Sequence, residues 1–149
     1  FIVSQADGQA KLIKTAREVN DSKPSWVIEK VDAAVADHLS SHPGKSEKDI
    51  VIACFGLAFK PDIDDLRESP SLEIAKNISN RHVGKVIVVE PNIASLPATL
   101  PNVELCSIEE AFERADVLLL LVDHKTFKSV PSSLLQGRQI VDTRGIWLV

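Results

Sequence analysis

The sequence of 149 residues contains no methionine. A chain of this length that starts with Phe1 and holds no methionine is expected to be a piece excised from a longer protein. It also has no apolar run long enough to cross a membrane, because the longest one, Val117–Val122, has the length of a single strand. No signal-peptide pattern opens the chain. The absence of targeting signals predicts a cytoplasmic protein.

Cysteine is also scarce, and acidic residues slightly outnumber basic ones. The two cysteines, Cys54 and Cys106, stand in apolar stretches, which favours reduced core thiols over a disulfide framework. The formal net charge of -4 argues against a nucleic-acid partner. The four histidines show no ligand spacing, and acidic residues at 62, 64 and 65 are better explained as stabilising the start of a following helix than as a metal cluster. We therefore predict no metal site.

Residues 1–40 have the pattern of a helical appendage. Apolar residues recur at helical spacing over 9–19 and again over 24–39, where Pro24 suits the first turn of a new helix. Asn20–Ser22 is expected to separate the two helices. Because so short a segment cannot bury its own apolar stripes, we expect them to pack on missing sequence or on another subunit.

A polar linker is predicted over 41–48, and an α/β domain over 49–149. Ser69–Pro70 supplies a helix N-cap followed by a proline at the first helical position, and Ser107–Glu110 fits a capping box. The expected strands are the apolar runs 50–55, 86–89, 117–122 and 139–141. Strands that alternate with helices in this way predict a small doubly wound, Rossmann-like parallel sheet covered on both faces.

Ligands of such sheets bind beyond the carboxyl ends of the strands. The loops expected there are 56–69, 90–92, 123–125 and 142–145. The first loop lacks the spacing G-x-G-x-x-G, but Gly56 permits close approach of a ligand, Lys60 offers a point charge for a phosphate, and Arg67 offers a bidentate fork. As generic chemistry the signal is weak, because a glycine followed by a lysine after a first strand is more often a turn with a solvated side chain than an anion site.

As a family signature this loop is more specific. Gly56–Pro61, Asp64–Asp65 and Arg67–Pro70 resemble the hallmark of the C-terminal, UDP-binding domain of the UDP-glucose/GDP-mannose dehydrogenase family. Phe1–Gln5 and Thr15–Asn20 resemble the end of that family's central helical domain. The resemblance thus reaches from one end of the chain to the other.

Three further segments extend the resemblance. Val141–Gly145 resembles the family's closing strand and the loop that reaches the nucleotide sugar. Within the family, Val89–Asn92 and Leu121–His124 resemble most the branch that oxidises UDP-N-acetyl-D-mannosamine.

The resemblance implies a homo-oligomeric, NAD-dependent enzyme that oxidises the C6 alcohol of a UDP-sugar to a carboxylate in two successive hydride transfers. The family holds the aldehyde-level intermediate on a cysteine thiolate, in a segment that would immediately precede Phe1. The family's NAD-binding domain would also lie outside this chain. On this view residues 1–40 are a remnant of the central helical dimerisation domain, and the 149 residues have no catalytic residue and no activity of their own.

The resemblance also assigns binding roles. Lys60 and Arg144 match residues that contact the UDP-sugar, Phe59 is expected to line the same site, and Arg67 matches an arginine that reaches the NAD. The positive end of the helix starting at Pro70 is expected to face the same cleft.

Structural alternatives accompany each assignment. Lys60 is otherwise a solvated lysine, Arg144 a surface residue, and Arg67 a partner in a salt bridge that only shapes the loop; for Arg67 both roles can coexist. Cys54 is expected to be a packed core thiol, and His124 a loop residue rather than a site residue.

Two other classes of function remain as alternatives. A signalling receiver would use Asp123 or Asp142 as a phosphate acceptor, but a receiver needs an acidic pair after its first strand, where this chain has Gly56–Ala58. A pure oligomerisation or interaction module would bind no nucleotide.

Overall fold

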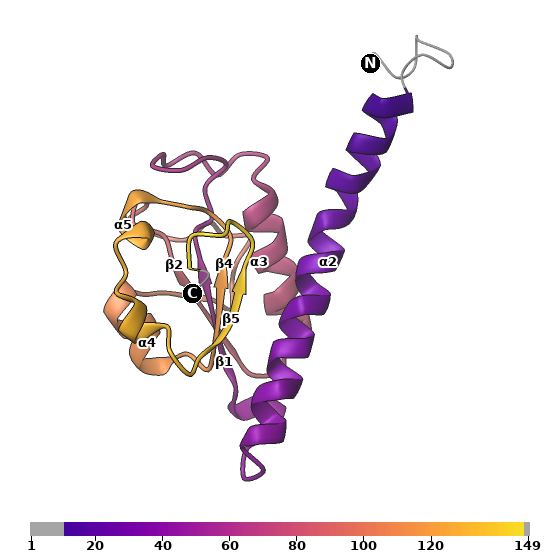
Figure 1. Ribbon diagram of the computed structural model, residues 1–149. Coiled ribbons are helices and arrows are strands. Elements are labelled where there is room, and N and C mark those ends of the chain that lie inside the picture. Colours follow the sequence, from indigo (N-terminus) through magenta and orange to yellow (C-terminus); the bar gives the residue numbers. More distant parts are fainter. Residues whose placement is uncertain (1–10, 148–149) are drawn as a thin grey trace.

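The computed structural model describes residues 11–147, in which a parallel sheet of five strands lies between two layers of helices (Figure 1). The strands stand in the order β3-β2-β1-β4-β5. Their bounds are Val51–Phe55 for β1, Lys85–Val89 for β2, Glu104–Leu105 for β3, Val117–Leu120 for β4 and Gln139–Asp142 for β5. The helices are α2 (Lys11–Ser41), α3 (Pro70–Arg81), α4 (Ile108–Arg114) and α5 (Lys125–Lys128), with 3-10 turns at Glu47–Asp49 and Ser132–Leu134. The predicted doubly wound, Rossmann-like fold is confirmed; the resemblance noted for Phe1–Gln5 lies outside the described residues.

Both faces of the sheet are buried. On β1, Ile52 and Cys54 point to a core shared with α2 and α3, whereas Ala53 and Phe55 point to a second core under α4 and α5. Burial on both sides explains why the strands read as continuous apolar runs rather than as alternating ones. The second core is closed by Trp147, whose indole Nε1 donates to a backbone carbonyl of α5, the Phe127 oxygen, at 2.9 Å.

The predicted starts of two helices are confirmed. The hydroxyl of Ser69 accepts a hydrogen bond from the backbone N–H of Leu72, and Pro70 follows as the first residue of α3. Ser107 and Glu110 form a capping box, with each side chain accepting from the backbone N–H of the other.

The predicted break at Asn20–Ser22 is wrong. α2 runs without interruption from Lys11 to Ser41 with Pro24 inside it (Figure 1). A proline inside a helix removes the hydrogen bond to the carbonyl four residues earlier, here that of Asn20. Because Asn20 is exposed, this carbonyl remains open to water, so the loss is tolerated.

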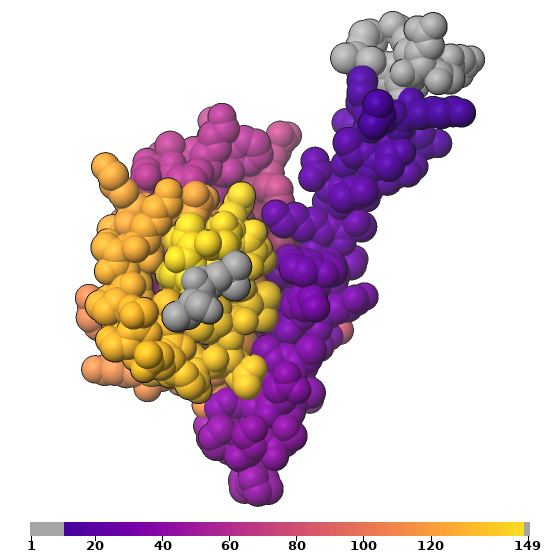
Figure 2. All heavy atoms as spheres, viewed as in Figure 1, coloured from indigo at the N-terminus to yellow at the C-terminus, as the bar shows by residue number. Residues whose placement is uncertain are grey.

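The expectation that the apolar stripes of α2 pack on missing sequence or on another subunit is also wrong for its second half. Val27, Val31, Ala34 and Val35 are buried in the same core as the sheet. Each fully buried valine contributes roughly 1.5 to 3 kcal/mol. The first half of α2 is exposed and projects beyond the α/β body (Figure 2).

Besides the two 3-10 turns, the structure contains a short strand, β3, and a short helix, α5, that the sequence did not predict. β3 has two residues and pairs only with β2 at the edge of the sheet. α5 has four residues and begins at Lys125, immediately after His124. Neither β3 nor α5 is long enough for its sequence to show the spacing of apolar residues that marks a strand or a helix.

Candidate functional site

The site candidates gather at one edge of the sheet. Because all five strands are parallel, the loops after β1, β2, β4 and β5 all leave from their carboxyl ends. Phe55 at the end of β1 pairs with Val89 of β2 on one side and with Leu120 of β4 on the other. The residues that follow these strands therefore meet beside Gly56.

The turn after β1 is shaped by Gly56. Its φ of 94° lies in the region that favours glycine. A Cβ built at this position would lie 2.5 Å from the Cβ of Val122, so the turn also has no space for a side chain. This turn directs the next two backbone N–H groups, those of Leu57 and Ala58, to one point.

That point is occupied by the carboxylate of Glu90. Its Oε2 accepts from the backbone N–H of Leu57 at 2.8 Å and of Ala58 at 3.2 Å, and lies 2.8 Å from Nε2 of His124. Its Oε1 accepts from the backbone N–H and the side-chain amide of Asn92 at 3.1 and 3.2 Å. The side chains of Glu90 and His124 are 0% and 1% exposed.

Burial opposes the charge of this carboxylate. The hydrogen bonds from His124, Leu57 and Asn92 outweigh that effect, and the pKa of Glu90 is lowered from its ordinary value. His124, expected to be a loop residue, has a buried ring that bonds both the carboxylate of Glu90 and the backbone N–H of Asp62. The available signal was that Glu90 directly follows β2 and that His124 lies in the loop after β4.

The predicted residues of the first loop are exposed. Phe59 is 47% exposed, and the Nζ of Lys60 lies 5.9 Å from the centre of the Phe59 ring. Arg67 makes two side-chain hydrogen bonds of 2.9 Å with the carboxylate of Asp65, while its side chain stays 88% exposed. These bonds lower the pKa of Asp65 to about 2. The structural alternative for Arg67 is thus present, and it leaves the other face of the guanidinium accessible.

Arg144 lies on a different part of the edge, beside a cavity of about 450 Å³ between α2 and the start of α3. The Nε of Arg144 donates to the carbonyl of Leu121 at 2.9 Å, which directs the guanidinium along the end of β4. The cavity is lined by Asn20, Asp21, Lys23, Pro24, Val27, Pro70, Ser71, Ile74, Leu121, Thr143 and Arg144. Phe59, Lys60 and Arg67 do not line it. Of the four predicted binding residues, only Arg144 lines this cavity.

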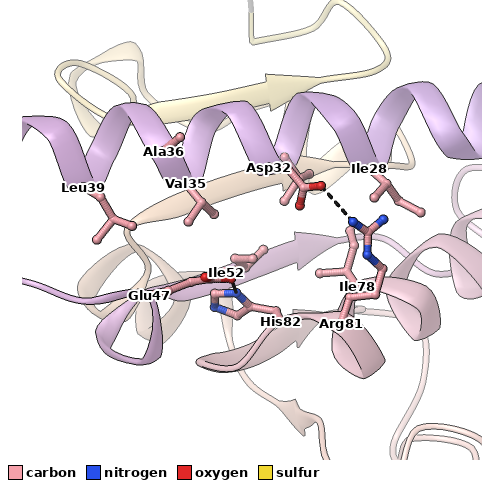
Figure 3. Close-up of a pocket in the computed structure, with 11 residues that line it drawn as sticks. Ile28, Asp32, Val35, Ala36, Leu39, Glu47, Ile52, Ile78, Arg81 and His82 are labelled. Carbon is pink, nitrogen blue, oxygen red and sulfur yellow. Dashed lines mark hydrogen bonds and ion pairs between the residues drawn. The ribbon is translucent and has the colours of Figure 1, made fainter.

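A second cavity of about 310 Å³ lies between α2 and α3, near the amino end of β1 (Figure 3). Apolar side chains of both helices line it, and an ion pair between Asp32 and Arg81, with a 3.0 Å contact, crosses its rim. His82 beside it bonds to the carbonyl of Ile50 at 2.8 Å. This cavity lies away from the loops that carry the predicted site residues.

Neither cysteine is suited to nucleophilic chemistry. Burial raises the pKa of Cys54 to about 12 and that of Cys106 to about 11, so both remain thiols. Among residues 11–147, no group of three or more histidine, cysteine or acidic side chains is arranged to hold a metal ion. None of the helices in this range combines the length and apolarity that crossing a membrane requires.

Comparison with known proteins gives consistent results. Residues 53–148 match the model of the UDP-glucose/GDP-mannose dehydrogenase family, UDP binding domain. A UDP-N-acetyl-D-mannosamine dehydrogenase from Salmonella typhi is 53% identical over 148 residues, which are 99% of this chain and 35% of that protein. An NDP-N-acetyl-D-galactosaminuronic acid dehydrogenase from Ralstonia solanacearum is 49% identical over 147 residues, which are 99% of this chain and 33% of that protein.

A solved structure of a UDP-N-acetyl-mannosamine dehydrogenase from S. aureus shares the fold with a TM-score of 0.72 and 29% identity. The match covers 98% of this chain and 32% of that one. The chain thus spans about a third of the length of the relatives it matches. The resemblance predicted from the loop after β1, and from Val89–Asn92 and Leu121–His124, is confirmed.

Proposed function

The chain belongs to the UDP-glucose/GDP-mannose dehydrogenase family, and on this premise we propose that it is the UDP-sugar-binding part of an NAD-dependent UDP-sugar 6-dehydrogenase. The observation that carries the proposal is the 53% identity over 99% of the chain to a UDP-N-acetyl-D-mannosamine dehydrogenase. UDP-N-acetyl-D-mannosamine is therefore the proposed substrate, oxidised to the uronate in two hydride transfers. The family match favours this function over the receiver and over an interaction module without nucleotide affinity.

The proposed binding roles agree with the charges at the sheet edge. Arg144 and Lys23 place two cations, against the single carboxylate of Asp21, on the cavity beside α3, where the helix starts with its positive end. Lys60 and Phe59 extend from the neighbouring loop with accessible side chains. We propose that Lys60 and Arg144 contact the UDP-sugar, that Phe59 lines its site, and that Arg67 reaches the NAD.

The reaction itself needs parts that these residues do not supply. The family's covalent step requires a cysteine thiolate, and both Cys54 and Cys106 are held as thiols by burial. We infer that the nucleophilic cysteine and most of the NAD site belong to the two thirds of the relatives' length that this chain does not span. We propose residues 1–40 as a remnant of the central helical dimerisation domain, 41–48 as a linker and 49–149 as the UDP-binding domain.

Calorimetric titration of the 149-residue chain with UDP tests the binding role. We expect Lys60→Ala and Arg144→Ala each to weaken UDP binding roughly 10- to 100-fold, because each removes a charged contact to the ligand. Lys48→Ala, on the 3-10 turn before β1, should leave binding unchanged. We expect NAD to bind more weakly than UDP, and no NADH to form when NAD and UDP-N-acetyl-D-mannosamine are added together.

The possible outcomes separate the parts of this proposal. If the folded Lys60→Ala variant binds UDP as tightly as the wild type, Lys60 is not part of the binding site. If titration with UDP releases or absorbs no heat, this chain does not bind UDP alone. If NADH forms when substrate is added, the chain is not inactive.

We also infer self-association through the projecting half of α2. Leu12, Ile13 and Val19 are 86%, 50% and 63% exposed, which leaves an apolar stripe uncovered. Replacing Leu12 and Val19 by glutamate should weaken the association at least tenfold in sedimentation experiments, because two charges would enter the buried interface. Leu134→Glu, at an exposed apolar residue outside α2, serves as the control. A chain that stays monomeric at all concentrations would contradict the inference.

A further inference from the structure

The turn after β1 holds an anion of its own. In dinucleotide-binding folds, the backbone N–H groups of this turn approach the phosphates of the ligand. Here the N–H groups of Leu57 and Ala58 both donate to Oε2 of Glu90, at 2.8 and 3.2 Å. A carboxylate of the protein thus stands where a ligand phosphate would otherwise stand.

The hydrogen-bonding capacity of this carboxylate is filled. A carboxylate offers about four lone-pair positions. Glu90 receives two backbone donors from the turn, the backbone and side-chain donors of Asn92, and the ring of His124. Its side chain is 0% exposed. The N–H groups of Leu57 and Ala58 are thus not free to bind a second anion. The carboxylate of Glu90 also has no acceptor position left for an ordered water.

The ring of His124 fixes the charge on Glu90. Its Nδ1 lies 2.8 Å from the backbone N–H of Asp62 and 3.3 Å from the side-chain amide of Asn92, so Nδ1 is the acceptor. The proton of the neutral ring is therefore on Nε2, which donates to Glu90 at 2.8 Å. The carboxylate remains the anion of the pair.

We propose that Glu90 is a specificity-determining residue that closes the β1–α3 turn to ligand phosphates by occupying it as an internal anion. Glu90 follows β2 and His124 follows β4, so the strands on both sides of β1 hold the turn closed. A diphosphate must then bind along the Lys60 and Arg144 side chains instead; this last consequence alone rests on the proposed function.

Chemical rescue tests the proposal without any nucleotide. Glu90→Ala leaves the donors of Leu57, Ala58 and His124 unpaired, and we expect the melting temperature of the chain to fall by roughly 10 °C. Sodium formate should restore part of that loss in a saturable way and move the amide NMR signals of the two turn residues. Inorganic phosphate should move the same signals in the variant but not in the wild type. Sodium chloride at equal ionic strength should do neither.

Val88→Ala is the matched control, because it leaves an apolar cavity on the same strand and should not respond to formate. The proposal is overturned if phosphate shifts the turn signals of the wild type, or if folded Glu90→Ala ignores both anions.

If Glu90→Ala does not fold, the variant Glu90→Gln still tests the proposal. The groups that face the carboxylate are His124 and, behind it, Asp62, whose Oδ1 is 3.9 Å from Nδ1 of the ring. Because the folded pKa of Glu90 is lowered, its charge stabilises the fold above the unfolded pKa, and this contribution is lost as pH falls through the folded pKa. The stability gap between wild type and Glu90→Gln should therefore narrow in acid. A gap that stays constant as pH is lowered would overturn the proposal.

Discussion

Gly56→Ala is expected to destabilise the fold strongly, because it meets both backbone strain and a close contact. Two costs coincide at this residue. Its φ of 94° is strained for any residue with a side chain, which costs about 1 to 3 kcal/mol. The added Cβ would also lie 2.5 Å from the Cβ and 2.9 Å from the Cγ2 of Val122, and overpacking of this kind costs about 1 to 3 kcal/mol more.

Together these costs reach about 2 to 6 kcal/mol, against a total stability of about 5 to 15 kcal/mol for a typical domain. Neither neighbour can move away easily, because the N–H of Gly56 is bonded to the carbonyl of Val89 and the N–H of Val122 to that of Phe55. Urea unfolding of the variant measures the loss. We expect it to be accompanied by weaker protection of the Leu57 and Ala58 amides from hydrogen exchange.

Two other glycines separate the causes. Gly137→Ala also has a positive φ, 71°, but nothing lies within 4 Å of the added Cβ, so it should show the backbone cost alone. Gly44→Ala has neither strain nor contact and should change the stability by less than about 1 kcal/mol. If Gly56→Ala is no less stable than Gly44→Ala, the close packing of the turn against Val122 is wrong.

The regular elements of the α/β domain were predictable because their signals are local. A strand buried on both faces is a short apolar run, and Ser69 and Ser107 mark helix starts through hydrogen bonds that span three residues. β3 and α5 were missed because two and four residues are too few to show a pattern.

Pro24 shows the limit of local rules. The proline and the polar residues before it predict a break, yet the exposed side of α2 lets water replace the missing hydrogen bond. Burial of Val27 and Val31 on the sheet fixes the second half of the helix. The tolerance of Pro24 and the burial of the second half both depend on the surroundings of α2. The sequence of the helix alone does not reveal those surroundings.

The candidate site was only partly predictable for the same reason. Sequence similarity pointed to Phe59, Lys60, Arg67 and Arg144, and their binding roles stay predictions. The bond between Glu90 and His124 joins residues 34 positions apart and exists because β2 and β4 flank β1. Their sequence shows two polar residues after two strands; only the strand order shows that they meet.

His124→Ala is expected to cost about 2 to 5 kcal/mol of stability at neutral pH, because it leaves two buried hydrogen-bonding groups unsatisfied at about 1 to 3 kcal/mol each, more for the charged one. The substitution takes a donor from the buried carboxylate of Glu90 and an acceptor from the backbone N–H of Asp62. It also removes an edge contact with the ring of Phe127, whose centre is 5.3 Å away. Urea unfolding compared with His42→Ala, at an exposed histidine, measures the loss; the control should change by less than about 1 kcal/mol.

The pH dependence distinguishes loss of this hydrogen bond from loss of packing alone. In the wild type, the lowered pKa of Glu90 means that its contribution to stability persists in mild acid and disappears as pH falls through the folded pKa. Without the His124 donor, burial is opposed by fewer hydrogen bonds and the folded pKa of Glu90 should rise. The gap between the folded and unfolded pKa of Glu90 is then smaller, so the stability of His124→Ala should fall less than that of the wild type as the pH is lowered from neutral into acid. His124→Gln, whose amide can donate to Glu90, should recover part of both effects. A loss no larger than that of His42→Ala, or an acid profile parallel to the wild type, would show that the ring does not hold the carboxylate in its charged form.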